Sequence, residues 1–169
     1  LVILLPQISK LFPYTTLFRS IPASDQEIPL GFITKGRREM QAGRFIDAFY
    51  SYFFFFETLF APGYSDPRKV TAKFKESSEV MNAFPEARKL TKPDIKHVHR
   101  MAALLAKTDN EIVEHLVEVR GKLHHHALPR KTGSWHPEKH EEFEPETTFL
   151  AMLAHVVSQT HTIPVMYSD

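Results

Sequence analysis

The segment Arg44–Phe60, RFIDAFYSYFFFFETLF, decides the fold class of this chain. At about 100° per residue its large apolar side chains form one broad stripe, whereas Asp47, Ser51 and Thr58 fall on the opposite side. This pattern predicts an amphipathic helix. Phe54 lies outside the stripe, so we expect neighbouring elements to cover the helix on more than one face. The stripe comprises Phe45, Phe49, Tyr52, Phe53, Phe56, Leu59 and Phe60.

Proline and glycine divide the rest of the chain into further helical segments, without an internal repeat or an alternating strand pattern. A second helix is expected over residues 66–84, with Pro67 in its first turn and Pro85 ending or kinking it. A third is expected to begin near Pro93. Its helically spaced apolar residues are Ile95, Val98, Met101, Leu104 and Leu105.

The fourth helix has the clearest start signal. Thr108 and Glu111 have the spacing of a capping box, in which each side chain bonds the backbone N–H of the other residue. The helix is therefore expected to begin at Asp109 and to stop before Pro129. Its apolar face comprises Ile112, Leu116, Val119 and Leu123.

A last helix is expected from Pro145 to just before Pro164, and residues 32–40 are the candidate for one more short helix. Short connections join these segments, as is typical of antiparallel helices packed around one core. The sequence therefore predicts an all-α fold, a four-to-five helix up-and-down bundle.

The first 20 residues are expected not to belong to this fold. Leu11–Ser20, LFPYTTLFRS, resembles the translation of a widely used sequencing adapter, so residues 1–20 are interpreted as a non-native artefact. Residues 21–31 are then a leader, residues 32–163 form a single helical domain, and residues 164–169 are a tail. The apolar run Leu1–Leu5 is far shorter than the roughly 20 residues of a membrane-spanning helix, so no membrane association is expected.

Composition limits the possible functions. The 169 residues suffice for one domain with a hydrophobic core, and 14 Phe indicate that aromatic packing dominates it. A net charge of +1 argues against a protein built to coat nucleic acid, so any phosphate binding must be local. The absence of Cys excludes disulfides and thiolate chemistry, and it suits a cytoplasmic location.

Between residues 120 and 140 the composition changes abruptly. Arg and Lys bind anions, and His changes its protonation near neutral pH, so this cluster suits a phosphate-bearing ligand. A purely structural explanation is equally open, because basic residues complement the dipole at a helix C-terminus and exposed histidines are well solvated. The cluster contains Arg120, Lys122, Arg130, Lys131 and Lys139 with a single acid, Glu138, and the histidines His124, His125, His126, His136 and His140.

His136 and His140 also have the spacing of a pair of metal ligands. Pro137 argues against a regular helix between them, no Cys or Asp lies nearby, and three consecutive histidines cannot all point at one ion. We therefore expect no metal site and no cofactor.

The segment EVRGKLHHH contains Arg120 and His125 at R-x4-H spacing, with His126 at R-x5-H. The earlier segment Ala48–Glu57 has the form AFYxYFxxFE, and a polar loop after the motif leads into a closing helix. In these features, over residues 32–163, the chain resembles the HEPN family of helical RNA-cleaving and nucleotide-binding domains.

The resemblance implies a metal-independent endoribonuclease, such as a toxin or a phage-defence component, that forms a homodimer with a shared cleft. His125 would act as general base or acid while the 2′-hydroxyl is transferred onto its neighbouring phosphate, and Arg120 would stabilise charge on the phosphoryl oxygens. The remaining side chains would bind RNA or a nucleotide: Lys122, His124, His126, Arg130 and Lys131.

Gly121 departs from the family pattern, because RNA-cleaving members often carry a polar residue directly after the Arg. It favours a second hypothesis, a non-catalytic RNA- or nucleotide-binding or dimerisation module. Either protein could work with an antitoxin or a nucleotidyltransferase. Because Gly costs up to about 1 kcal/mol inside a helix, we expect local loosening that lets His125 approach Arg120. In a regular helix their side chains would lie about 140° apart.

Overall fold

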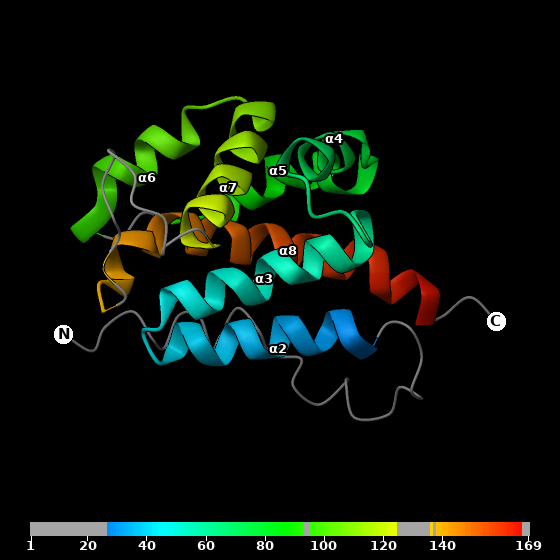
Figure 1. Ribbon diagram of the computed structural model, residues 1–169, viewed down its shortest axis with the longest axis horizontal. Helices are drawn as coiled ribbons and strands as arrows, with labels where there is room; N and C mark the ends of the chain where they lie inside the picture. Colours follow the sequence, from blue (N-terminus) through cyan, green and yellow to red (C-terminus); the bar gives the residue numbers. More distant parts are fainter. Residues whose placement is uncertain (1–26, 93–94, 125–135, 137, 167–169) are drawn as a thin grey trace.

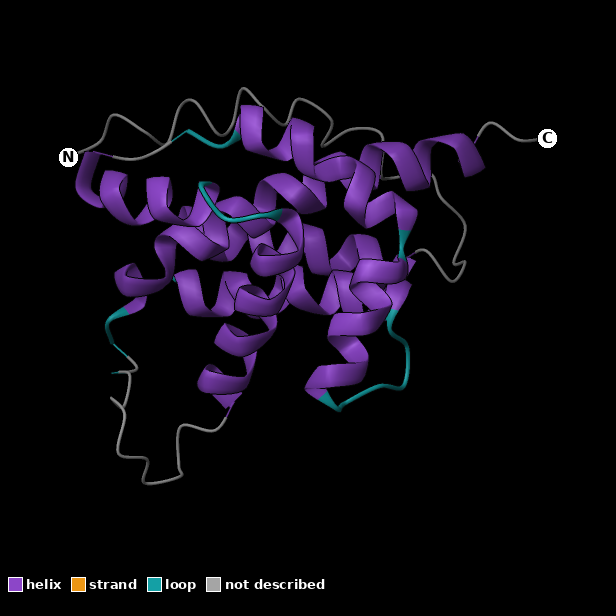
Figure 2. Cartoon of the chain, turned by 90° about the horizontal axis from the view of Figure 1, so that it is seen from above, coloured by secondary structure: helices purple, strands orange, loops and turns teal. Residues whose placement is uncertain are grey.

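The computed structural model describes residues 27–92, 95–124, 136 and 138–166. The elements in these residues are helical, so the predicted all-α fold is confirmed (Figure 1, Figure 2). This part of the chain has seven α-helices rather than four or five, together with two 3-10 helices. In chain order they are α2 (Glu27–Gln41), α3 (Phe45–Phe60), α4 (Pro67–Glu76), α5 (Ser78–Leu90), η2 (Ile95–His97), α6 (Val98–Leu105), α7 (Asp109–His124), η3 (His140–Phe143) and α8 (Glu144–Met166).

α2 and α3 form an antiparallel pair along one side of the molecule (Figure 1). Gly43, whose φ is +72°, lets the chain reverse between them. Gly36 permits their close contact, because a Cβ at this position would lie 2.9 Å from the buried ring of Tyr52. α8 packs against α3 and α5, and α4 packs against α7. α3 is thus central to the packing.

The core is built around phenylalanine, as the composition predicts. α3 is covered on more than one face, which confirms the expectation drawn from its sequence. Ser51 was predicted to lie on the polar side of this helix, but it is buried. Its Oγ donates a hydrogen bond to the carbonyl of Asp47 at 2.8 Å. This bond satisfies the hydroxyl within its own helix. The largest buried rings are those of Phe49, Phe53, Phe55, Phe56, Phe84 and Phe149.

The predicted second helix is in fact two helices. α4 ends at Glu76 and α5 begins at Ser78, because the hydroxyl of Ser77 accepts a hydrogen bond from the backbone N–H of Val80 at 3.3 Å and caps the new helix. Pro85, expected to end or kink the helix, lies inside α5. Proline removes one backbone hydrogen bond there, but burial of the neighbouring Phe84 keeps the segment packed.

Two other segments differ from the prediction near their starts. α2 begins at Glu27 rather than at residue 32, and it buries Leu30, which the sequence assigned to a leader. The predicted third helix opens with a 3-10 turn before α6. Val98 is 39% exposed although its spacing placed it with the apolar residues of that helix.

α7 begins at Asp109, as its capping box predicts. α8 begins one residue before Pro145 and extends to Met166, so the prediction that it closes before Pro164 is wrong.

Among the described helices, none is both long and apolar enough to cross a membrane. The predictions for residues 1–26 and 167–169, including the adapter-like segment, lie outside the described residues.

Candidate functional site

Arg120 is positioned by α7. The backbone N–H of Thr108 donates to a carboxylate oxygen of Glu111 at 2.7 Å, and the N–H of Glu111 donates to Thr108 Oγ1 at 3.3 Å, which confirms the capping box. This start sets the register of the helix, and the predicted apolar face packs into the core. Arg120 then lies beside α3. The buried residues of that face are Ile112, Leu116, Val119 and Leu123.

Glu57 of α3 receives the side chain of Arg120. Arg120 Nη2 lies 3.1 Å from Glu57 Oε1, and the two side chains are only 16% and 15% exposed. The two atoms form an ion pair, and Oε1 is itself buried. Burial raises the pKa of Glu57, and the charges of Arg120 and His124 oppose this only in part. The Arg120–Glu57 pair is thus held between α7 and α3 in partly buried surroundings.

His124 ends α7 one helical turn after Arg120, so the two side chains share a face, about 40° apart. The charge of His124 also acts on Glu57. Lys122 is exposed and lies about 200° from Arg120 around the helix, so it belongs to a different face. The structure thus brings Arg120 together with His124 and separates it from Lys122.

Gly121 does not loosen α7, which is a continuous helix up to His124. The expected local opening is therefore not found in this helix. A Cβ on Gly121 would meet no atom within 4 Å, so nothing in the described chain requires glycine here. The predicted catalytic His125 lies outside the described residues, as do three predicted binding residues, His126, Arg130 and Lys131.

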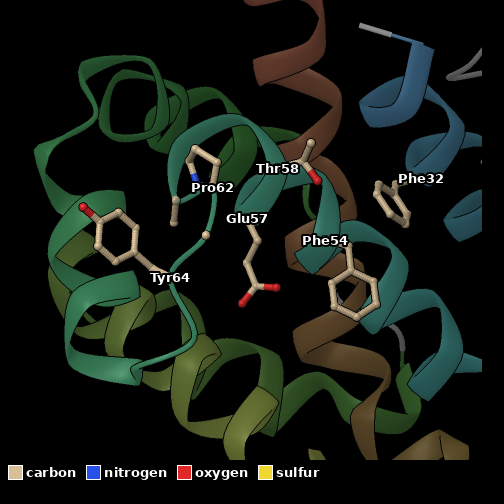
Figure 3. Close-up of a pocket in the computed structure, with 8 residues that line it drawn as sticks. Phe32, Phe54, Glu57, Thr58, Pro62 and Tyr64 are labelled. Atoms are coloured by element: carbon tan, nitrogen blue, oxygen red, sulfur yellow. The ribbon is translucent and has the colours of Figure 1, made fainter. Parts of the chain in front are cut away.

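Glu57 also lines a pocket of about 320 Å³ near the C-terminal end of α3 (Figure 3). Its carboxylate projects into the space between Phe54 and Tyr64, which are 38% and 40% exposed. Gly63, whose φ is +79°, lets the chain turn after α3 and carry Tyr64 to the far side of the pocket. Phe32 of α2 completes the aromatic wall beside Phe54.

The two histidines considered as metal ligands have other contacts. His140 Nδ1 accepts a hydrogen bond at 3.3 Å from the backbone N–H of Ile46, in the first turn of α3, where such groups lack partners within the helix. His136 Nδ1 accepts from the N–H of Glu138 at 3.3 Å. In the part of the chain that is described, no group of three or more His, Asp or Glu could hold a metal ion.

A buried carboxylate, Glu146 of α8, belongs to a second cluster that the sequence does not reveal. Arg100 Nη2 donates to its two oxygens at 3.1 and 3.2 Å, and His115 Nε2 lies 3.3 Å from Oε1. Burial alone would raise the pKa of Glu146, but the bonds from His115 and its own backbone, with the charge of Arg100, outweigh burial and lower it. These contacts tie α6 and α7 to α8.

No protein-family model matches this chain, and the curated proteins and the solved structures gave no significant match. A guanidinium held by a carboxylate, with an imidazole on the same helix face, can bind a phosphate and move a proton without a metal ion.

Proposed function

We propose that this chain is a HEPN-like, metal-independent endoribonuclease. The observation that supports this best is the placement of Arg120, which Glu57 holds beside a pocket and on the same helix face as His124. A guanidinium whose orientation is already fixed can stabilise developing charge on a phosphoryl group without reorganising during the reaction.

In the proposed reaction a histidine removes the proton of the RNA 2′-hydroxyl, and the oxygen attacks the adjacent phosphorus. The bond from phosphorus to the 5′-oxygen breaks, and that oxygen takes up a proton from solvent, to which the histidine then returns the proton it accepted. The products end in a 2′,3′-cyclic phosphate and a 5′-hydroxyl. The family resemblance assigns the histidine role to His125, whereas the regular geometry of α7 favours His124.

The test is cleavage of single-stranded RNA by the purified chain in the presence of EDTA, with end-group analysis of the products. Arg120→Ala is expected to lower the rate by about 10²- to 10⁴-fold, since it removes a group that acts at the reacting phosphate. Arg100→Ala is the matched control, because Arg100 also pairs with a buried glutamate but lies in the other cluster. Its rate should stay within about twofold of the unaltered chain.

Single alanine substitutions at His124, His125 and His126 identify the proton-transfer residue, since only one of them should lower the rate by about 10²-fold or more. If RNA is bound but never cut, and Arg120→Ala changes only the affinity, the chain is the non-catalytic module that Gly121 favours. If Arg120→Ala alters stability alone, the pair with Glu57 is structural and the enzyme proposal is wrong.

The proposal includes a cytoplasmic homodimer, which the resemblance implies, with an antitoxin or a nucleotidyltransferase as a further partner. Two copies would place both motifs at one cleft. Sedimentation at micromolar concentration measures whether the chain is a monomer or a dimer. A monomer that nonetheless cleaves RNA would remove the shared cleft from the mechanism.

A further inference from the structure

The pocket at the C-terminal end of α3 is walled by exposed aromatic rings (Figure 3). Phe54 and Tyr64 are 38% and 40% exposed. The Phe54 ring is supported by its neighbours, because its centroid lies 5.6 Å from that of Phe32 and 5.9 Å from that of Tyr50 in a stacked arrangement. The backbone N–H of Tyr64 donates to the carbonyl of Ala61 at 3.2 Å, which fixes the turn that carries the other ring. The aromatic walls are therefore in place before any ligand arrives.

The size and lining of this pocket suit a flat ring but do not select one. About 320 Å³ lies at the lower end of the range for small-molecule sites. Oε1 of Glu57 is buried and paired with Arg120, so it does not read the edge of a ligand. Exposed aromatic side chains are the platforms on which proteins stack unpaired bases, and stacking tolerates any base because every base has a flat face.

Positive charge lies at two edges of the pocket. Arg68 and Lys69 are exposed in the first turn of α4, four and five residues after Tyr64. Arg120 contacts Glu57, which lines the pocket. Because Glu57 balances the charge of Arg120, the two exposed cations of α4 carry the larger share of the long-range attraction for an anion. Aromatic rings between cations are the arrangement with which proteins hold the bases and phosphates of a single strand.

The stability of α4 does not explain its two exposed cations. The first turn of this helix has no acidic residue, and positive charge near a helix N-terminus opposes the helix dipole. Asp66 caps the helix, and its Oδ1 accepts a hydrogen bond from the backbone N–H of Arg68 at 2.8 Å. Arg68 and Lys69 thus make their own helix less favourable, whereas a phosphate at this edge would offset their charge.

We infer that this pocket binds one unpaired base of a single-stranded RNA, which stacks against Phe54 and Tyr64 while Arg68 and Lys69 hold an adjoining phosphate. The inference deepens the proposed function, on which it rests for RNA as the ligand. It makes the pocket a binding site that accepts any base, so the chain selects unpaired RNA rather than a base sequence.

The first experiment measures binding of four hexanucleotides to the full chain by fluorescence anisotropy. Three are 2′-O-methyl oligomers of A, C or U, and the fourth is an abasic oligomer with the same backbone charge. None has a free 2′-hydroxyl, so none can be cut by the proposed reaction. We expect the three base-bearing oligomers to bind within about fivefold of one another and about tenfold more tightly than the abasic one. Equal binding of the abasic oligomer would overturn the inference, and so would binding confined to one base.

Variants of Tyr64 separate stacking from simple apolar contact. Tyr64→Leu keeps an apolar side chain but removes the ring, so base-bearing oligomers should bind about tenfold more weakly and the abasic oligomer should bind as before. Tyr64→Phe is the matched control, because it keeps the ring, and its affinities should stay within about twofold. Tyr64 is 40% exposed, so both variants should fold. Unchanged binding by Tyr64→Leu would exclude the pocket.

A double variant tests the charged edge. Arg68→Gln combined with Lys69→Gln should weaken binding of the base-bearing and the abasic oligomers by the same factor, about threefold or more at low salt, and the loss should shrink as salt is added. Lys89→Gln is the control, because Lys89 is exposed on α5 and does not line the pocket. A double variant that binds as tightly as Lys89→Gln would show that the two cations hold no phosphate, and the inference would be wrong.

Failure of this inference and failure of the ribonuclease proposal are distinguishable. A chain that prefers base-bearing oligomers through Tyr64 but cleaves no RNA keeps the stacking pocket and loses the enzyme. A chain that cleaves RNA while Tyr64→Leu binds every oligomer as before keeps the enzyme and loses the pocket. If Tyr64→Leu instead converts a dimer into a monomer and leaves oligomer binding unchanged, a second copy of the chain covers these rings, and the inference is overturned.

Discussion

Glu57 is a partly buried carboxylate and Glu146 a buried one; each faces an arginine, but their surroundings differ. Glu146 accepts bonds from Arg100 and His115, and its pKa is lowered. Glu57 pairs with Arg120 alone, as far as the described residues show an ion pair, and burial raises its pKa. A satisfied buried carboxylate stabilises a fold, whereas an under-satisfied one suits a binding site. The contrast therefore predicts that Glu146 matters mainly for stability, and the proposed function predicts that the Glu57 pair matters for activity.

The largest effect is expected when each arginine is changed to lysine, and this pair of variants tests the contrast. Arg120→Lys is expected to slow RNA cleavage by about 100-fold, because lysine keeps the charge but lacks the planar fork that binds a phosphate at two points. Arg100→Lys should leave the rate within about twofold. Initial rates with one RNA substrate provide the measurement. Equal losses in the two variants would remove the functional contrast between the clusters.

The second prediction concerns stability. Glu146→Gln is expected to lower the free energy of unfolding by about 2–4 kcal/mol, because it removes the charge from a buried hydrogen-bonded pair. The loss is limited because Arg100 is partly exposed to solvent. Glu57→Gln should cost less, about 1 kcal/mol, because loss of the attraction to Arg120 is offset by removal of a poorly solvated charge. Urea unfolding of both variants gives the comparison. A larger loss at Glu57 would contradict it.

The two carboxylates should also respond to pH with opposite sign. The pKa of Glu146 lies below its ordinary value of 4.5, so its stabilising effect is present above pH 4.5 and is lost as the pH falls through the folded-state pKa. The pKa of Glu57 is raised, so its protonation stabilises the fold as the pH falls towards 4.5. As the pH falls from 7 to 3, the difference in unfolding free energy between the unaltered chain and Glu146→Gln should therefore narrow, whereas the difference between the unaltered chain and Glu57→Gln should widen.

Local signals made the helices predictable, and they also explain the errors. The phenylalanine stripe of α3 and the capping box of α7 each lie within one element, so both could be recognised in the sequence. The break at Ser77 was missed because this serine lies at helical spacing after Phe74, although a serine two residues before Glu79 is also a helix-start signal. The tendency of Pro85 to end or kink the helix was overestimated, because the sequence does not show that its neighbours are buried.

The site was harder to predict because it is assembled by tertiary contacts. Arg120 was identified from its spacing to His125, but its partner Glu57 was not, although an acid inside an apolar helix was a usable signal. Glu146 gave no such signal, since His115 and Arg100 lie 31 and 46 residues away from it in the chain. Only the packing of α6 and α7 on α8 brings these three residues together.

The smallest expected effect comes from Gly121→Ala, next to Arg120. A Cβ there meets nothing within 4 Å, and alanine is the better helix former, so the free energy of unfolding should rise by up to about 1 kcal/mol. A glycine that no contact inside the described chain requires suits a surface that RNA or a second copy approaches closely. We therefore expect RNA affinity to fall in the variant that gains stability, measured by titration of an uncleavable RNA. Higher stability with unchanged affinity and unchanged dimerisation would instead make Gly121 a simple weakness of α7, without a role in RNA binding.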